Sequence, residues 1–184
     1  MSTERYFLET HIPGGDLPIL RVHTSPDPQQ EKHLHITFIR PFVTHQPESV
    51  KQKIVDFCCQ QSPISFFLEG KNNFDQNTFY IPVTSNRLQK FNDDLEEILT
   101  HDVTFDDKLS DQKTLHLTID RNIPPLPKTE MIMTRLTCIR NSYDGNGKRI
   151  WFSYDFVTHE TLNRLESLDP IYWQRSQNLY RSQH

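Results

Sequence analysis

The chain has 184 residues, a formal net charge of -4 at pH 7 and 35% hydrophobic residues. This length suffices for one domain with a sizeable core, and the negative charge argues against a protein that grips long duplex nucleic acid through many phosphate contacts. No apolar run reaches the roughly 18 residues of a membrane span or resembles a secretory signal. The three cysteines are odd in number and form no CxxC pair. We therefore expect a cytoplasmic protein with reduced thiols, no membrane contact and no metal site.

The first predicted elements are short strands. Apolar runs at 6–11 and 19–22 are each followed by turns that contain proline, so both runs predict strands that end in loops. A third strand is predicted at 34–38, where apolar residues alternate with His35 and Thr37. Because residues two apart point to the same face of a strand, His35 and Thr37 should lie side by side.

Helical spacing begins at Pro47. Apolar residues recur every three or four positions over 47–61, and proline suits a first helical turn, so a helix is predicted there. Two β-rich runs at 64–69 and 78–83 flank an asparagine-rich turn and predict a hairpin. Ser85 then caps a second predicted helix that carries its apolar residues on one face.

The second half of the chain begins with a strand, 115–119, in which apolar residues alternate with His116 and Thr118. A proline-rich connection at 124–127 should interrupt strand pairing and mark a crossing between two lobes. We therefore expect two strand-helix-hairpin-helix units, each of which contributes one His-x-Thr strand.

Runs at 131–140 and 149–157 predict a second hairpin, and Thr158 is expected to cap a last short helix. The predicted fold class is therefore α+β, with two similar lobes of antiparallel sheet, helices on the outside and a central cleft. We treat 1–184 as a single bilobal domain whose tail, about 174–184, is loosely held.

The pattern His-x-Ser/Thr occurs four times and is weak by itself. His23 runs into a proline turn and His159 lies at the start of a predicted helix, which argues against catalysis by either. His35 and His116 differ because each lies inside an alternating strand, in the near repeats HITFIR and HLTIDR. His33 shares a face with His35 and is interpreted as a bystander.

Two such strands side by side suit in-line displacement at phosphorus. A neutral imidazole takes a proton from the attacking water, and a protonated one gives a proton to the departing ribose oxygen. The hydroxyls of Thr37 and Thr118 can donate hydrogen bonds to nonbridging phosphate oxygens. The alternative is that both histidines are ordinary sheet residues and that threonine serves strand propensity.

The motif strands HLHITFIRPF and TLHLTIDR, with the opening RYFLETHIP, resemble the 2H phosphoesterase superfamily, which includes 2'-5' RNA ligase-like proteins and cyclic nucleotide phosphodiesterases. The resemblance implies two pseudosymmetric lobes, no metal or other cofactor, and hydrolysis of a 2',3'-cyclic phosphate of a nucleotide or RNA end to a 2'-phosphate. It implies catalytic roles for His35 and His116, with Thr37 and Thr118 as substrate contacts. The first motif departs from the family habit of a proline before the histidine.

The resemblance also implies a phosphate contact for Arg121, because family members often carry a basic residue after the second motif. Arg40 has the same spacing after the first motif. Simple alternation points both arginines away from the cleft. Their participation therefore requires a bend near the strand ends.

Other functions fit the same motifs. Some family members act on ADP-ribose 1'',2''-cyclic phosphate or on 2',5'-oligoadenylate, and the chain could instead bind RNA ends or nucleotide phosphates without turnover. In that case Tyr80, Tyr143 or Trp151 would offer stacking surfaces. The near symmetry of the motifs leaves acid and base roles open, although we favour His116 as the base. Hydrolase and ligase activity also stay open, and we expect a monomer.

Overall fold

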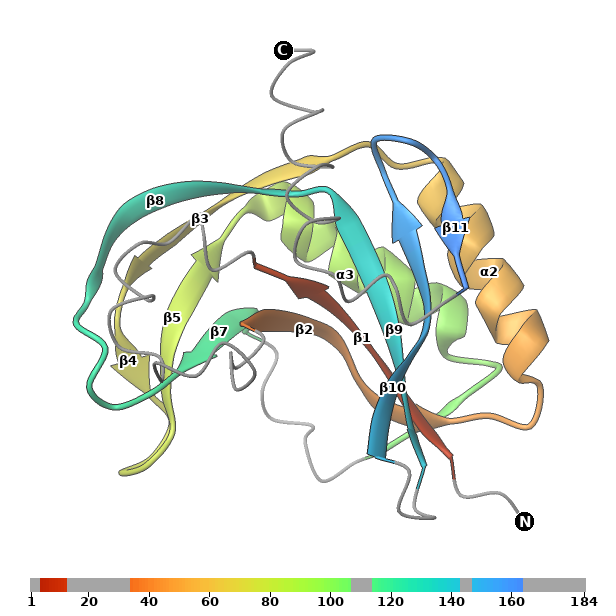
Figure 1. The fold of residues 1–184 in the computed structure, drawn as a ribbon, viewed down its shortest axis with the longest axis horizontal. Helices are drawn as coiled ribbons and strands as arrows, with labels where there is room; N and C mark the ends of the chain where they lie inside the picture. The colour runs from red at the N-terminus through yellow and green to blue at the C-terminus, as the bar shows by residue number, and fades with distance from the viewer. Residues whose placement is uncertain (1–3, 13–33, 107–113, 143–146, 164–184) are drawn as a thin grey trace.

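The strands pair into one antiparallel sheet. The computed structural model describes residues 4–12, 34–106, 114–142 and 147–163. The strands are β1 (Arg5–His11), β2 (His35–Val43), β3 (Ile64–Gly70), β4 (Asn72–Asn73), β5 (Phe79–Thr84), β6 (Thr104–Phe105), β7 (His116–Ile119), β8 (Leu126–Met133), β9 (Arg135–Ser142), β10 (Gly147–Asp155) and β11 (Thr161–Leu162). Their order is β11-β10-β9-β1-β2-β7-β5-β3-β8, with β4 beside β5 and β6 beside β2. Figure 1 shows β1 and β2 near the middle of this curved sheet.

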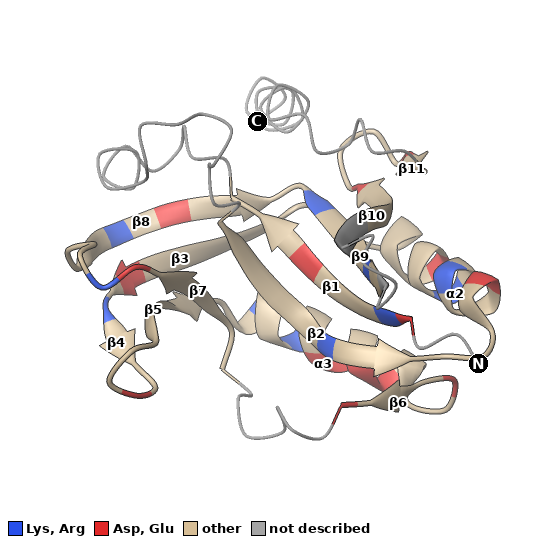
Figure 2. Cartoon of the chain, turned by 60° about the horizontal axis from the view of Figure 1, so that its bottom comes forward, with Lys and Arg blue, Asp and Glu red and all other residues tan. Residues whose placement is uncertain are grey.

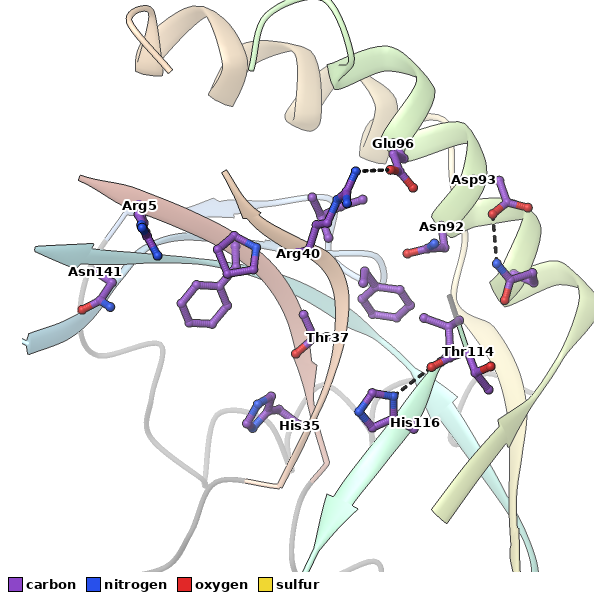
Figure 3. A pocket seen from close by; sticks show the side chains of 16 residues that line it. Arg5, His35, Thr37, Arg40, Asn92, Asp93, Glu96, Thr114, His116 and Asn141 are labelled. Atoms are coloured by element: carbon purple, nitrogen blue, oxygen red, sulfur yellow. Dashed lines mark hydrogen bonds and ion pairs between the residues drawn. The ribbon is translucent and has the colours of Figure 1, made fainter. Parts of the chain in front are cut away.

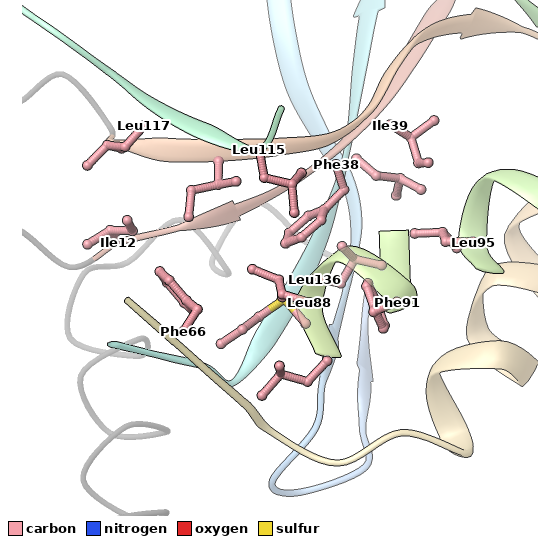
Figure 4. Packing of buried hydrophobic residues seen from close by; sticks show 14 of the residues in the cluster. Ile12, Phe38, Ile39, Phe66, Leu88, Phe91, Leu95, Leu115, Leu117 and Leu136 are labelled. Carbon is pink, nitrogen blue, oxygen red and sulfur yellow. The ribbon is translucent and has the colours of Figure 1, made fainter. Parts of the chain in front are cut away.

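The two described helices, α2 (Pro47–Cys59) and α3 (Asn86–Leu99), pack against the sheet. Ser85 caps α3, since its hydroxyl accepts a hydrogen bond from the Leu88 amide. The buried face of α3 meets apolar residues of β2 and the segment before β7, and Figure 4 shows Leu88 and Phe91 next to Phe38 and Leu115. The main core therefore lies between the helices and one face of the sheet, and the other face carries polar side chains and a small apolar cluster of Phe7, Ile139 and Ile150.

The α+β class and the antiparallel pairing are confirmed. The helix predicted at 47–61 is α2, and the predicted 64–69/78–83 hairpin is the β3–β5 pair, in which Leu68 lies opposite Val83. These elements depend on local signals, namely apolar spacing, proline at a first turn and asparagine-rich turns. The second strand predicted, at 19–22, lies outside the described residues, as does the 174–184 tail.

The hairpin predicted at 131–140 and 149–157 is present as β9 and β10. The extent of its first strand is wrong, because 131–140 contains parts of two strands in different halves of the sheet. β8 pairs with β3, β9 pairs with β1 and β10, and Thr134 between them accepts a hydrogen bond from the Phe156 amide through its carbonyl. The chain thus crosses between the halves at Thr134 rather than at 124–127. Pro127 lies inside β8, which is the last strand of the order, and such an edge position tolerates a missing amide hydrogen.

The helix predicted from Thr158 is also wrong over the residues described there. The Asp155 carboxylate accepts hydrogen bonds from the amides of Val157 and Thr158 and so forms a turn. The chain then returns as β11, where Leu162 lies opposite Ser153 of β10. The rest of the predicted helix lies outside the described residues.

Charges of both signs are interspersed on the described elements. Figure 2 shows basic and acidic segments near one another on α2 and on β8. Within the part of the chain that is described, no helix has the length and apolar character that crossing a membrane requires.

Candidate functional site

The two His-x-Thr motifs lie on neighbouring antiparallel strands. Ile36 of β2 is opposite Leu117 of β7, and both side chains are fully buried. In this antiparallel register, the residues that flank the pair also face each other across the strands, so His35 lies toward Thr118 and Thr37 lies toward His116. The motifs are therefore related by a local twofold, with apolar residues in the core and polar residues on the opposite face.

A pocket of about 750 Å³ opens at this pair of strands. His35, Thr37 and His116 all line it, and Figure 3 shows their side chains extending from β2 and β7 toward a shared region. Arg40 and residues of α3, including Asn92 and Glu96, line the pocket farther along. This volume lies within the range of small-molecule sites in proteins.

Two of the predicted site residues lie outside the lining of this pocket. Thr118 is exposed on β7, where it is opposite Tyr80 of β5. Arg121 is exposed in the turn after β7, and its main-chain carbonyl accepts a hydrogen bond from Lys71 Nζ at 2.6 Å. The structure thus brings together one complete motif and the histidine of the other.

Arg40 lines the pocket although simple alternation pointed it away. The β1–β2 ladder has an irregularity here, since Glu9 is opposite Thr37 whereas Leu8 is opposite Ile39. The extra residue, Phe38, shifts the alternation of β2 after Thr37. The guanidinium of Arg40 lies 4.9 Å from the Phe105 ring centroid and 3.7 Å from the Glu96 carboxylate.

The ring of His116 is held by a hydrogen bond and by aromatic contacts. Its Nδ1 lies 2.8 Å from the Thr114 carbonyl oxygen. Because a carbonyl oxygen only accepts, Nδ1 carries the hydrogen, and the unprotonated nitrogen of the neutral ring is Nε2. Phe74 and Tyr80 meet the ring edge to face at centroid distances of 4.8 and 5.5 Å, and they stack on each other at 4.1 Å.

His35 lies near a carboxylate that the sequence did not single out. Glu9 on β1 is only 5% exposed, and its Oε2 lies 3.7 Å from His35 Nε2. His11 Nε2 donates to the other oxygen, Oε1, at 2.5 Å. This contact could be predicted only from the pairing register of two strands that are distant in sequence. In that register His11 is opposite His35 and Glu9 is opposite Thr37.

The other predicted stacking residues have different surroundings. Trp151 packs on Tyr6 and Phe152, with ring centroids 4.9 and 5.3 Å apart, and Lys51 lies over its ring. Tyr143 lies outside the described residues. Among the described residues, no group of three His, Cys, Asp or Glu side chains is placed to hold a metal ion.

A comparison with protein families identifies one family. The profile of the 2'-5' RNA ligase superfamily matches residues 20–153. No curated protein sequence matches the chain.

Solved structures share the fold at low sequence identity. The protein TT0787 of Thermus thermophilus is 13% identical with a TM-score of 0.54, and the match covers 83% of this chain and 97% of that one. The LigT protein of E. coli complexed with 3'-AMP is 14% identical with a TM-score of 0.53 and the same coverage. A phosphoesterase is 14% identical with a TM-score of 0.55, covering 80% of this chain and 93% of that chain. The chain belongs to the 2'-5' RNA ligase superfamily, within the 2H phosphoesterases that its paired motifs predict.

Proposed function

We propose that this protein hydrolyses the 2',3'-cyclic phosphate of a nucleotide or RNA end and leaves a 2'-phosphate. The observation that supports it is the pocket where His35 and His116 meet beside Thr37. Two imidazoles and a hydroxyl around one cavity suit general acid–base catalysis at an anionic phosphorus. The nucleotide in the related LigT structure, 3'-AMP, supports a nucleotide phosphate as the class of ligand.

In the proposed reaction His116 is the base. Its Nδ1 donates to Thr114, so Nε2 is available to take a proton from water as the water oxygen attacks phosphorus. The bond from phosphorus to the 3'-oxygen breaks, and His35 gives that oxygen a proton. One water molecule is consumed, and both histidines return to their starting state when the proton passes back through solvent.

The remaining predicted residues have supporting roles in this proposal. Thr37 donates to a nonbridging oxygen, and Arg40 adds positive charge in the same pocket. Thr118 and Arg121 lie along β7 and the following turn, where they would contact a ligand that extends beyond the pocket, such as an RNA end. The exposed part of the stacked Phe74–Tyr80 pair would support a base.

We propose that the protein acts as a cytoplasmic monomer without a cofactor. All three cysteines are free thiols, which suits a reducing compartment. The experiment must separate this reaction from the alternatives that the sequence leaves open. These are turnover of ADP-ribose 1'',2''-cyclic phosphate, turnover of 2',5'-oligoadenylate, and binding of an RNA end without reaction.

The test is turnover of purified full chain with chelator on 2',3'-cyclic mononucleotides, a short RNA ending in a cyclic phosphate, and the two alternative substrates. Phosphorus NMR identifies the product isomer. We expect 2'-phosphates, and His35→Ala and His116→Ala should each lower kcat by about 10²- to 10⁴-fold. His101→Ala, at an exposed position after α3, is the matched control and should keep wild-type rates.

Two results would overturn the proposal. Binding of 2'-AMP without turnover of any cyclic phosphate favours a silent binder. Exclusive turnover of ADP-ribose 1'',2''-cyclic phosphate or of 2',5'-oligoadenylate assigns the site to that substrate instead.

A further inference from the structure

A buried carboxylate lies beside one catalytic histidine, and the two-histidine reaction does not use it. Glu9 is in the middle of β1, whose acidic segment is visible in Figure 2. Its cross-strand neighbours are Thr37 on β2 and Thr137 on β9. A carboxylate at 5% exposure is costly unless hydrogen bonds or opposite charge compensate its lost hydration.

The compensation comes from two imidazoles. His11 and Glu9 share a face of β1 because they are two residues apart, and His11 is opposite His35. His11 Nε2 donates to Oε1 at 2.5 Å, while Oε2 lies 3.7 Å from His35 Nε2. The His11 and His35 ring centroids are 6.4 Å apart. The carboxylate is thus held by His11 on one side and directed toward the catalytic ring on the other.

The other charged groups of this face are engaged elsewhere or lie farther along it. Arg135 of β9 donates to the carboxylate of Asp155 of β10 at 2.8 Å, so the two charges largely cancel. On the far side of His35, β7 contributes His116, and farther along β2 lies Arg40 with its ion pair to Glu96. Arg5 at the start of β1 pairs with Asp106 at 2.8 Å. Among the described residues, Glu9 is therefore the carboxylate that pairs with His35.

We propose that Glu9 is a positioning residue that holds His35 in its protonated form, oriented toward the leaving oxygen, and that His11 fixes the Glu9 carboxylate. This rests on the proposed function. A negative charge at 3.7 Å attracts an imidazolium much more strongly than a neutral ring, and partial burial strengthens that attraction. The nearly symmetric motifs thereby become asymmetric, since His116 faces the Thr114 carbonyl and His35 faces a carboxylate. His35 is the acid and His116 the base.

The first test is the pH–rate profile of Glu9→Gln, which removes the charge and keeps the shape. Because the alkaline limb reports loss of the acid's proton, it should move to lower pH, while the acidic limb stays in place. At pH 8 we expect kcat to fall about tenfold, less than the loss of the general acid itself, with KM within twofold. Glu130→Gln, which removes an exposed carboxylate of β8 that does not line the pocket, is the control and should leave the alkaline limb unchanged.

The second test needs neither turnover nor a folded variant. In wild-type protein labelled with ¹⁵N-histidine, the ring nitrogens of His35 should show the protonated form at pH values where His116 is already a neutral ring with hydrogen on Nδ1. An unmoved alkaline limb in Glu9→Gln, or His116 as the more protonated ring, overturns the inference. A wild-type protein without any turnover overturns the proposed function, while the ¹⁵N spectra still decide whether His35, the ring beside Glu9, is the more protonated of the two.

Discussion

Ile36 and Leu117 lie opposite each other on β2 and β7, and each is the fully buried central residue of a His-x-Thr motif. This apolar pair sets the spacing of the two imidazoles, because each histidine is the sequence neighbour of one of its members. A cavity beneath the pair should therefore disturb both the stability of the fold and the geometry of the pocket.

Ile36→Ala should lower the free energy of unfolding by about 2–5 kcal/mol and kcat by about tenfold, because the strand can shift into the cavity. Leu99→Ala is the matched control, since Leu99 is equally buried but lies at the end of α3 and does not line the pocket. It should cost similar stability without lowering kcat. Urea denaturation and initial rates, both at 25 °C, make the comparison, and equal kcat losses would contradict it.

The two arginines that follow the motifs should contribute to the binding of different substrates. Arg40 lines the pocket, whereas Arg121 is exposed beyond it. A charged hydrogen bond contributes about 1.5–3 kcal/mol, so Arg40→Ala should raise KM for a cyclic mononucleotide about tenfold or more. Arg121→Ala should leave that KM within twofold and raise it only for a longer RNA end. Steady-state kinetics on both substrates test this prediction. A larger rise in KM for the cyclic mononucleotide in Arg121→Ala than in Arg40→Ala would contradict it.

The sequence predicted the elements that depend on local signals. The capped helix after Ser85, the β3–β5 hairpin and the alternating strands of both motifs follow from residue spacing and turn chemistry. The crossing at Thr134 escaped prediction because apolar residues continue on both sides of it, and no proline or glycine marks the change of partner strand.

The surroundings of the site depend on register, which a single strand does not encode. Glu9 reaches His35 only because β1 pairs with β2, and Arg40 enters the pocket through a ladder irregularity at Phe38. Sequence alternation gave no sign of either. The His-x-Thr strands were predictable because they repeat, while their neighbours come from segments without a repeat.

The three cysteines should differ in reactivity. Cys58 and Cys138 are buried, and burial raises the pKa of both thiols, with the negative charge of Glu9 adding to the rise at Cys138. Since the thiolate is the reactive form, neither should react quickly in the folded protein, whereas exposed Cys59 should. A disulfide reagent should label one thiol rapidly and all three in denaturant, and Cys59→Ser should abolish the rapid phase. A rapid phase that survives in Cys59→Ser would contradict the buried positions of the other two.

The buried pair of Arg135 and Asp155 should make stability sensitive to acid. The two side chains are 0% and 1% exposed and lie 2.8 Å apart. Burial by itself would raise the pKa of Asp155, but hydrogen bonds from Arg135 and from the amides of Thr158 and Val157 outweigh it, so the pKa is lowered. A carboxyl whose pKa is lower in the folded chain adds stability that is complete above its unfolded value of about 3.9 and is lost as pH falls through the folded value.

Asp155→Asn should therefore cost about 3–5 kcal/mol at pH 7, because it leaves the Arg135 charge buried beside a neutral amide. The difference from wild type should shrink below about pH 4, where the carboxyl of the unfolded wild-type chain takes up a proton while the folded one still resists protonation. Asp106→Asn, which breaks the surface pair with Arg5, should cost at most about 1 kcal/mol at pH 7. Urea unfolding at pH 7 and pH 3.5 measures both variants. A constant difference between Asp155→Asn and wild type at the two pH values would mean that the ionised carboxylate does not stabilise the folded chain.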